Sequence, residues 1–512
     1  MNPSMPTATR GMRARAHPAL APLLITAATL TPAPSPLLAQ DGYDIVLSGG
    51  RVMDPETGFD AVRNVGIRAG EIAAISEDPL SGTVVLHVAG LVVAPGFIDL
   101  HAHGQTNQAN EFQARDGVTT ALELESGAAL PAAYLARRGE GAILNYGATV
   151  SHMSVRPKAM PARADAVRQA LALAATDPQR ALRELASVGS AARYDPVLPE
   201  DYPALRAALA DGLAAGALGI GMAHQYYPGA DHEEILEVFR FAADEGATIH
   251  THVREMSIAA MQEVLANAVA TGAPLHIVHV NSSSLWRIGP ILDLIGGIRS
   301  RGFDVTTEAY PYTAASTGLQ SALFDPGWRE SLRIGYGDLQ WQDTGERLTA
   351  ETFQRYRAEG GTVIIHMMKD EWIREALSRD FVMVASDGMR YAPGAHPRGA
   401  GTFSRFLGRY VRDEGLMPLM EGLARITIMP ARRLERMTDQ ARRKGRLQAG
   451  MDADITVFDP AKIIDTATFE DDLSHSVGVV HVLVGGEFVV RNGRNVPGAT
   501  PGRALVGRGR GG

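Results

Sequence analysis

The sequence predicts an α/β protein built on a (β/α)8 TIM barrel, with a small composite β-sandwich domain made from both ends of the chain. From residue 96 to residue 439, short apolar runs such as "ALELE" and "PLHIVHV" alternate with Ala/Leu/Arg-rich helical stretches, which is typical of a parallel sheet. Residues 41–95 and 440–495 instead show short β-rich runs broken by Gly and Asp. The chain has 512 residues, which is enough for a barrel and an accessory domain.

Residues 1–40 have the pattern of a secretory signal peptide. A stretch with three arginines precedes the apolar segment "ALAPLLITAATL" and the Pro-rich segment "PAPSPLLAQD", which offers a small-residue cleavage site. The apolar run is about 12 residues long, whereas a spanning helix needs roughly 20, so we expect removal rather than retention as an anchor helix. The mature protein is therefore expected outside the cytoplasm, in the periplasm, with no membrane association after signal removal.

Two further segments interrupt the alternating pattern. Residues 324–380 are rich in Trp, Arg and acidic residues and are longer than a plain β/α connection, so we expect an insertion before the last barrel strand. Residues 496–512 are rich in Gly and Arg and offer almost nothing to bury, so we expect a flexible tail.

Composition excludes several kinds of chemistry. The chain contains no cysteine, so disulfides, thiolate nucleophiles and Cys-based metal sites are ruled out, and any metal must be held by His, Asp or Glu. The net charge of -8 is mild for this length, and Lys and Arg are scattered, so a nucleic-acid partner is not expected. Small-molecule partners remain, and the composition leaves the oligomeric state open.

Imidazole and carboxylate side chains stand at the ends of four predicted strands. Strand residues two apart share a face, so the two histidines of "GFIDLHAH" can converge on one point. In a β/α barrel the functional groups lie at the C-terminal strand ends, and neutral imidazole is the commonest metal ligand. The runs "GFIDLHAH", "TIHTHV", "LHIVHV" and "FVMVASDG" present His101, His103, His250, His252, His276, His279 and Asp387.

Taken together, these motifs resemble the amidohydrolase superfamily, and within it the N-acyl-D-amino-acid deacylase (D-aminoacylase) branch. The resemblance covers nearly the whole chain after the signal segment, and the ordered set is specific although no single stretch is. The stretches that carry it are "VVAPGFIDLHAHG", "GVTTALELESG", "NYGATVSHMSVR", "GALGIGMAHQYYPG", "THVRE", "VHVNSSS", "EAYPYTAAST", "VMVASDG", "HPRGAGTFSRFLGRYVR" and "GRLQAGMDADITVFDP".

The resemblance implies a centre of one or two divalent ions, with zinc as the default and manganese, cobalt or iron as alternatives. His250 and His276 are then expected to support the ligands or to pack in the core. D-aminoacylases place a cysteine at the end of strand 2, where this chain has "LELESG", so Glu125 is expected to replace it, with Glu123 as the alternative. The full expected ligand set is His101, His103, Glu125, His252, His279 and Asp387.

The implied reaction is hydrolysis of a linear amide, the deacylation of an N-acyl-D-amino acid. A metal lowers the pKa of bound water, so hydroxide is available to attack the carbonyl, and Asp387 acts as general base and then as general acid. Arg398 matches the family's arginine for the substrate carboxylate. The remaining residues expected to bind the substrate are Tyr312, Ser316, Asn281 and His152.

Two alternatives remain open at this stage. Asn281 stands where the family usually has lysine, which favours a cyclic-amide hydrolase or a dipeptidase of the same superfamily. An exported solute-binding protein could also use the barrel without turnover, although Asp387 and the complete ligand set argue against it.

Overall fold

The computed structural model describes residues 42–174, 176–471 and 473–509. The predicted signal peptide over residues 1–40 lies outside these ranges. In the described part of the chain, no helix combines the length and apolar character that a membrane span requires.

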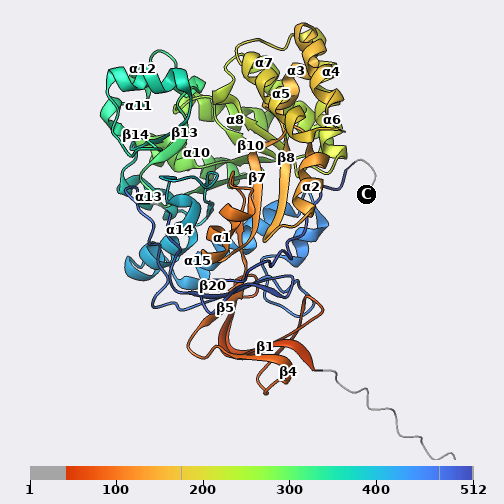
Figure 1. Ribbon diagram of the computed structural model, residues 1–512, viewed down its shortest axis with the longest axis vertical. Coiled ribbons are helices and arrows are strands. Elements are labelled where there is room, and N and C mark those ends of the chain that lie inside the picture. The colour runs from red at the N-terminus through yellow and green to blue at the C-terminus, as the bar shows by residue number, and fades with distance from the viewer. Residues whose placement is uncertain (1–41, 175, 472, 510–512) are drawn as a thin grey trace, which may run out of the picture. The chain divides into compact units, whose positions relative to one another are not determined.

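A parallel sheet of eight strands forms the barrel and confirms the predicted fold class. The strands follow one another around the sheet in chain order, and β7, β8 and β10 stand among the surrounding helices in Figure 1. The amide N–H of His103 donates to the Gly388 carbonyl (2.8 Å), which joins the two edges of the sheet just beyond β6 and β16. The strands are β6 (Phe97–Asp99), β7 (Val118–Ala128), β8 (Asn145–Ser151), β9 (Ile220–Ala223), β10 (Ile249–His252), β11 (Leu275–Ile277), β12 (Val305–Ala309) and β16 (Val382–Val384).

The barrel helices begin and end where the sequence supplies capping residues. In α7 (His232–Glu245), the Asp231 side chain accepts from the Glu234 N–H, and Gly246 ends the helix in the left-handed conformation. Its buried face carries apolar residues at helical spacing, which packs the helix onto the sheet. The other helices of the barrel are α1 (Asn107–Arg115), α2 (Pro131–Gly139), α3 (His152–Ala159), α4 (Ala164–Ala172), α5 (Pro178–Ala191), α6 (Tyr202–Ala214), α8 (Ile258–Thr271), α9 (Val280–Ser284), α10 (Ile288–Arg299), α13 (Asp370–Leu377), α14 (Arg398–Arg405), α15 (Leu419–Ile426) and α16 (Ile428–Leu434).

Both ends of the chain build one additional sheet of nine strands. Strand β17 pairs antiparallel with β5, so a strand that follows the barrel hydrogen-bonds to one that precedes it. Lys444 Nζ donates to Asp454 Oδ2 (2.7 Å) in the buried region where β17 begins. The strands are β1 (Tyr43–Asp54), β2 (Phe59–Arg68), β3 (Glu71–Ser76), β4 (Gly82–His87), β5 (Val92–Pro95), β17 (Ile455–Phe458), β18 (Val479–Val484), β19 (Glu487–Arg491) and β20 (Arg494–Asn495).

The insertion before the last barrel strand has its own small antiparallel sheet and core. Strands β13 (Ala315–Gly318), β14 (Leu339–Trp341) and β15 (Thr362–Ile365) pair with one another. This group therefore begins at residue 315 rather than at the predicted residue 324, because β13 leaves the barrel directly after β12. Its short helices are α11 (Trp328–Leu332) and α12 (Ala350–Glu359), and Trp328 stacks on Phe353 at 5.3 Å between ring centres.

The prediction of a flexible tail over residues 496–512 is wrong for residues 496–509. The Tyr146 N–H in β8 donates to the Arg503 carbonyl (3.1 Å), and the Leu505 N–H donates to the Tyr146 carbonyl (2.7 Å). The glycines that suggested disorder instead permit close backbone approach, since a Cβ on Gly502 would lie 2.1 Å from the Leu144 carbonyl oxygen. Backbone hydrogen bonds and the buried Leu505 hold this segment on the barrel.

Candidate metal centre

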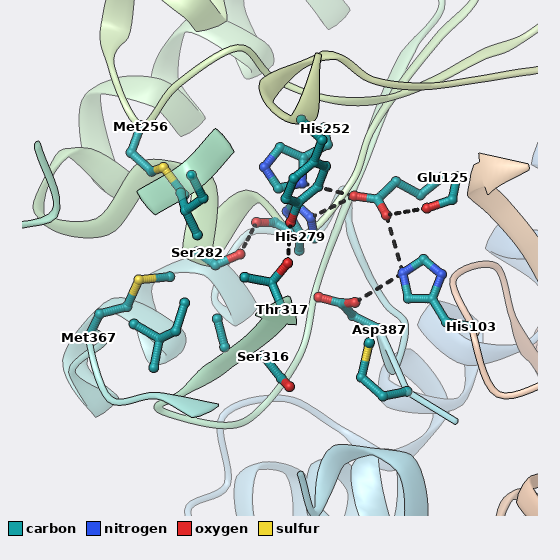
Figure 2. Close-up of a pocket in the computed structure, with 16 residues that line it drawn as sticks. His103, Glu125, His252, Met256, His279, Ser282, Ser316, Thr317, Met367 and Asp387 are labelled. Carbon is teal, nitrogen blue, oxygen red and sulfur yellow. Dashed lines mark hydrogen bonds and ion pairs between the residues drawn. The ribbon is translucent and has the colours of Figure 1, made fainter. Parts of the chain in front are cut away.

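The six side chains expected to bind metal converge at the C-terminal ends of the barrel strands, and Figure 2 labels all of them except His101. They come from five places in the barrel: the turn after β6, strand β7, the end of β10, the turn after β11 and the turn after β16. This is the end of a β/α barrel at which active sites lie. The six residues are His101, His103, Glu125, His252, His279 and Asp387.

Four of these side chains form a first group whose donor atoms face one another. His101 Nε2 and His103 Nε2 are 3.2 Å apart, and each lies 3.5 Å from Asp387 Oδ1. Glu125 Oε2 lies 3.4 Å from the first imidazole nitrogen and 3.2 Å from the second. Ligands at about 2.1 Å from a tetrahedral ion are separated by about 3.4 Å, so this donor set fits a divalent cation such as zinc.

The second oxygen of Glu125 faces a second group of donor atoms. Its Oε1 lies 2.9 Å from His252 Nδ1 and 3.2 Å from His279 Nε2. Glu125 thus presents one oxygen to each group, which is the arrangement required of a bridging ligand. Of the two candidates, Glu125 rather than Glu123 stands between the groups.

The imidazoles of the first group each have a carboxylate on their outer side. His101 Nδ1 lies 2.7 Å from Glu308 Oε1, and His103 Nδ1 lies 2.8 Å from Glu123 Oε2. The other oxygen of Glu308 lies 3.0 Å from His276 Nε2. His276, which was expected to support the ligands or to pack, is therefore part of a buried network one step behind them.

Neutral groups occupy the outer side of the second group. His252 Nε2 lies 2.5 Å from Gln225 Oε1, which belongs to the 3-10 turn η3 (His224–Tyr226), and His279 Nδ1 lies 3.0 Å from Ser283 Oγ. Every imidazole of the centre therefore has one ring nitrogen turned inward and the other held by a neighbour. Such outer partners fix the tautomer and the orientation of a metal-binding histidine.

The carboxylate side chains in and around the centre outnumber the arginine that contacts them. Burial alone would raise the pKa of Asp387, but the Arg398 guanidinium and the His101 imidazole hold that pKa well below its ordinary value. Burial would likewise raise the pKa of Glu308, whereas hydrogen bonds from His101 and His276 lower it to about 2. Buried carboxylates that stay ionised need cationic partners, which a divalent ion supplies.

Two of the converging residues have unusual backbone conformations. His279 has φ of 34° and Asp387 has φ of 50°, which place both in the left-handed region that L-residues rarely adopt. Each stands at the turn directly after a barrel strand, where the chain must aim its side chain into the centre. Backbone strain of this kind clusters at functional sites.

A cavity of about 160 Å³ opens beside the two groups. Its polar wall includes Ser316 and Thr317 of β13, and the Thr317 hydroxyl donates to the hydroxyl of Tyr226 (3.1 Å). Its apolar wall is formed by Met256, Leu323, Ile365, Met367 and Met389. The insertion therefore lines the cavity with both polar and apolar side chains.

Arg398, in the first turn of α14, is buried behind the cavity residue Asp387. Its Nη1 lies 2.8 Å from Asp387 Oδ2, and its guanidinium stacks over the Tyr310 ring at 4.8 Å. The Nη2 atom donates to the Ser316 carbonyl at 3.3 Å, while the Ser316 hydroxyl has no partner among the described residues. The predicted substrate-binding residues Arg398 and Ser316 are thus brought to the centre.

The other three predicted substrate-binding residues are placed elsewhere. The Tyr312 hydroxyl donates to Asp465 Oδ2 (3.0 Å), which turns the ring away from the cavity. Asn281 bonds both to the carbonyl and to the N–H of Tyr310, so its amide is used to hold the backbone after β12. His152 is fully buried outside the cavity and bonds to the Tyr227 hydroxyl at 3.0 Å.

Sequence reasoning missed the outer partners Glu308 and Gln225 and the cavity residue Tyr226. Glu308 has a signal in the sequence, since an acid within the apolar β12 run "VTTEAY" must have a buried partner. Gln225 and Tyr226 lie in the stretch "AHQYYPG" at the end of β9. This stretch indicated the end of a strand, but it did not indicate which of its side chains face the centre.

A profile of the amidohydrolase family matches residues 87–490, and the chain belongs to that family. D-aminoacylase from Alcaligenes xylosoxydans xylosoxydans is 31% identical over 500 residues, which cover 87% of this chain and 94% of the relative. N-acyl-D-glutamate deacylase from the same organism is 31% identical over 496 residues, with 91% of this chain and 97% of the relative covered.

A solved structure with the same architecture is that of N-acyl-D-glutamate deacylase from Bordetella bronchiseptica, complexed with zinc and a phosphonate inhibitor that mimics the tetrahedral intermediate. It superimposes with a TM-score of 0.75 and 26% identity, covering 91% of this chain and all of that one. The relatives are metal-dependent N-acyl-D-amino-acid deacylases, as the predicted resemblance implied.

Proposed function

We propose that this protein is a metal-dependent hydrolase that removes the acyl group from N-acyl-D-amino acids. The observation that carries the proposal is the placement of Glu125 between two sets of inward-facing ligand atoms, beside a cavity lined by Asp387, the ion-pair partner of Arg398. The names of the full-length relatives support the linear amide and the D configuration of the substrate.

Two metal positions follow from the donor groups. In this proposal the first position is held by His101, His103, Glu125 and Asp387, and the second by Glu125, His252 and His279. The mixture of imidazole and carboxylate ligands suits zinc and also accepts manganese, cobalt or iron. When bound, the metal supplies a Lewis acid for the substrate carbonyl and lowers the pKa of water.

Asp387 is the residue that moves the proton. One carboxylate oxygen, Oδ1, faces the first group and the other, Oδ2, faces Arg398, so the side chain lies between the ligand atoms and the substrate site. From this place the carboxylate takes the proton of the attacking water and delivers it to the departing nitrogen, acting first as general base and then as general acid.

Arg398 and the hydroxyls of the cavity orient the substrate. The planar guanidinium suits two parallel hydrogen bonds to the substrate carboxylate, and stacking on Tyr310 fixes its plane. Ser316, with a free hydroxyl that lines the cavity, is placed to donate to the carboxylate or to the developing oxyanion. Together these groups hold the acyl carbon near Asp387.

The cavity wall favours an apolar amino-acid side chain. The apolar lining residues come from the insertion and from the loops after β10 and β16, and they include three methionines, a leucine and an isoleucine. No Lys or Arg is among the lining residues of the described chain. An acidic substrate side chain would lose its hydration there without gaining a cationic partner. The preferred substrates are therefore N-acyl derivatives of amino acids such as methionine or leucine.

The test is a substrate panel on protein of measured metal content. N-acetyl-D-methionine and N-acetyl-D-leucine are expected to be hydrolysed in preference to their L enantiomers, to N-acetyl-D-glutamate and to cyclic ureides. Turnover of cyclic ureides alone would overturn the proposal. Asn281 bonds to the Tyr310 backbone, so in this proposal its amide takes no part in binding either kind of substrate.

We also propose export to the periplasm, which the composition of residues 1–40 supports. Mass spectrometry of the N-terminus of protein recovered from the periplasmic fraction tests this. A start near residue 40 is expected, and an intact N-terminus in the cytoplasmic fraction would contradict it.

A further inference from the structure

One aspartate of the composite β domain lies against the substrate side of the barrel. Asp465 follows β17 in the chain, and its side chain is 5% exposed. The backbone beside it is fixed, because the Ile464 N–H donates to the Val477 carbonyl (3.2 Å) and the Val477 N–H donates to the Ile464 carbonyl (3.0 Å). Asp465 does not line the cavity, so any effect on the reaction must act through its neighbours.

The Asp465 carboxylate joins two segments of the barrel that contain proposed substrate-binding residues. Its Oδ2 accepts from the Tyr312 hydroxyl and from Arg405 Nη1, each at 3.0 Å. Tyr312 lies four residues before Ser316 of β13. Arg405 ends α14, the helix that begins with Arg398. One oxygen atom therefore links both segments to the β domain.

Arg405 adds direct contacts between the same two segments. Its Nε donates to the Pro311 carbonyl (2.7 Å), and its guanidinium stacks over the Tyr312 ring at 4.7 Å. The Arg405 side chain is 23% exposed, so its orientation depends on the buried carboxylate that it meets. Without the Asp465 carboxylate, the guanidinium would lose the acid that holds it and the tyrosine hydroxyl would lose its acceptor.

The Asp465 region also packs directly against α14. A Cβ on Gly401 would lie 2.4 Å from the Asp465 Cβ and 2.9 Å from the Tyr312 hydroxyl oxygen. Atoms do not pack so closely, so the glycine is what permits this contact. Gly401 lies three residues after Arg398, which places the two on neighbouring positions of one helix face. A movement at Asp465 therefore reaches the turn of α14 that contains the arginine.

The first turn of α14 has a separate attachment to the β13 segment. His396 Nε2 donates to the Ala314 carbonyl (3.0 Å), and its Nδ1 accepts from the Arg398 N–H (3.0 Å). The helix is thus held by His396 at its start and by Asp465 at its end. Loss of the second attachment would let α14 pivot about the first, which changes the position of Arg398 relative to Ser316. Binding groups keep their geometry only when the residues behind them are fixed.

We infer that Asp465 is a positioning residue that sets the spacing of Arg398 and Ser316 and so determines how well the substrate carboxylate is bound. The inference rests on the proposed function, in which those two residues meet that carboxylate. It adds a residue of the β domain to the substrate site. It also assigns to the Tyr312 hydroxyl a role that requires no contact with the substrate.

Two substrates that differ only at the carboxylate test this role. N-acetyl-D-methionine and N-acetyl-D-methionine amide share the scissile bond and the side chain, and acetate release from each gives kcat/KM. The unmodified protein is expected to prefer the acid, because a guanidinium and a hydroxyl can bind it. Any change in kcat that arises through Asp387 affects both substrates and cancels in the ratio of the two values.

Asp465→Ala is expected to lower the preference for the acid by about 10-fold or more, since a misplacement of roughly 1 Å can cost about 10²-fold. Tyr312→Phe removes only the hydroxyl that donates to Asp465, so a smaller decrease in the same direction is expected. The melting temperature and the zinc content of each variant show whether the fold and the metal centre are intact. Neither is expected to account for the change in the ratio.

Asp370→Ala is a matched control. The Asp370 carboxylate also accepts from a tyrosine hydroxyl, that of Tyr410 (2.7 Å), and from an arginine, Arg409 Nη2 (2.6 Å). It joins α13 to residues 406–413, which lie beyond the end of α14. The preference of this variant for the acid is expected to stay within about twofold of that of the unmodified protein, as for independent sites.

An unchanged preference in folded Asp465→Ala would overturn the inference, as would an unchanged preference in Tyr312→Phe if the first variant does not fold. An equal decrease in Asp370→Ala would also overturn it, because the effect would then be general. Acetate release by the unmodified protein from both substrates at equal rates would overturn the inference alone. Release from neither substrate would instead overturn the proposed function.

Discussion

Two buried clusters of histidine and glutamate in the described part of the chain differ in their charge balance, and the proposed metal centre is the one with the properties of a binding site. In the cluster outside the centre, Glu234 accepts from Arg156 Nε (2.5 Å) and Nη2 (2.9 Å) and lies 3.1 Å from His152 Nε2. The negative charge of Glu234 is balanced there by the positive charge of Arg156. In the proposed metal centre, the acids outnumber the single arginine and the ring nitrogens point at a common place.

The comparison shows that burial and residue type do not distinguish a ligand from a structural histidine. His152 and His252 are both buried at the ends of barrel strands. The difference is whether the surrounding charges cancel and whether donor atoms converge at ligand separations. Changing each cluster separately tests this distinction.

The largest effect is expected at Asp387. Asp387→Asn keeps the shape of the side chain but removes a proton acceptor and an anionic ligand, so kcat is expected to fall at least about 10²–10⁴-fold. Circular dichroism should show an unchanged fold. Near-normal turnover of N-acetyl-D-methionine by this variant would rule out its role as base.

Glu125 comes next, because it contacts both groups of donor atoms. Glu125→Gln is expected to weaken metal binding by more than the about 10–100-fold typical of an outer partner, and activity should fall in parallel. Metal analysis after dialysis measures the loss. A variant that keeps two ions per chain would show that Glu125 is not a bridge.

In the charge-balanced cluster of Arg156, Glu234 and His152, a substitution is expected to lower stability and to leave metal binding unchanged. Arg156→Met leaves Glu234 buried without its strongest partner, which should lower the free energy of unfolding by about 3–5 kcal/mol. Metal content and turnover of the folded fraction should not change, because this cluster lies outside the centre. Urea denaturation measures the free energy of unfolding. Loss of metal from the folded variant would contradict the distinction between the two clusters.

The smallest effect concerns a histidine that has no acidic partner in its immediate network. Burial, with a smaller contribution from Arg491, lowers the pKa of His481 to about 4. Since the folded pKa lies below the unfolded value, its contribution to stability is present above about pH 6.5 and is lost as the pH falls through 4.

His481→Gln should therefore flatten the acid-side decline in stability between about pH 6.5 and 4, as measured by urea denaturation at a series of pH values. The stability of the unmodified protein over the same range is the reference. An equally steep decline in the variant would show that His481 does not contribute to it.

The sequence predicted site residues best where the position of a residue on a barrel strand determines the direction of its side chain. The spacing of His101 and His103 and the strand end before Asp387 predicted their convergence, because all barrel strands end at the same face. Choosing between Glu123 and Glu125 was harder, since β7 has an irregularity between Glu123 and Ala128 that breaks the simple alternation of sides.

What could not be predicted depends on contacts between distant segments. Glu308 meets His101 across 207 residues, and no local pattern shows that pairing. Tyr312 matched a family motif, but Asp465 from beyond the barrel takes its hydroxyl. The Gly-rich tail was misjudged for the same reason, because Gly502 fits against Leu144 only once the barrel exists.

The convergence of imidazole and carboxylate side chains, with more acids than cationic partners, marks this chain as a metal-dependent amidase. The most direct measurement is hydrolysis of N-acetyl-D-methionine by metal-free protein as zinc is restored, with bound zinc determined in the same samples. No turnover is expected without metal, and turnover is expected to appear as zinc binds, with at most two ions per chain. Full activity in metal-free protein, or failure to bind zinc at all, would contradict this prediction.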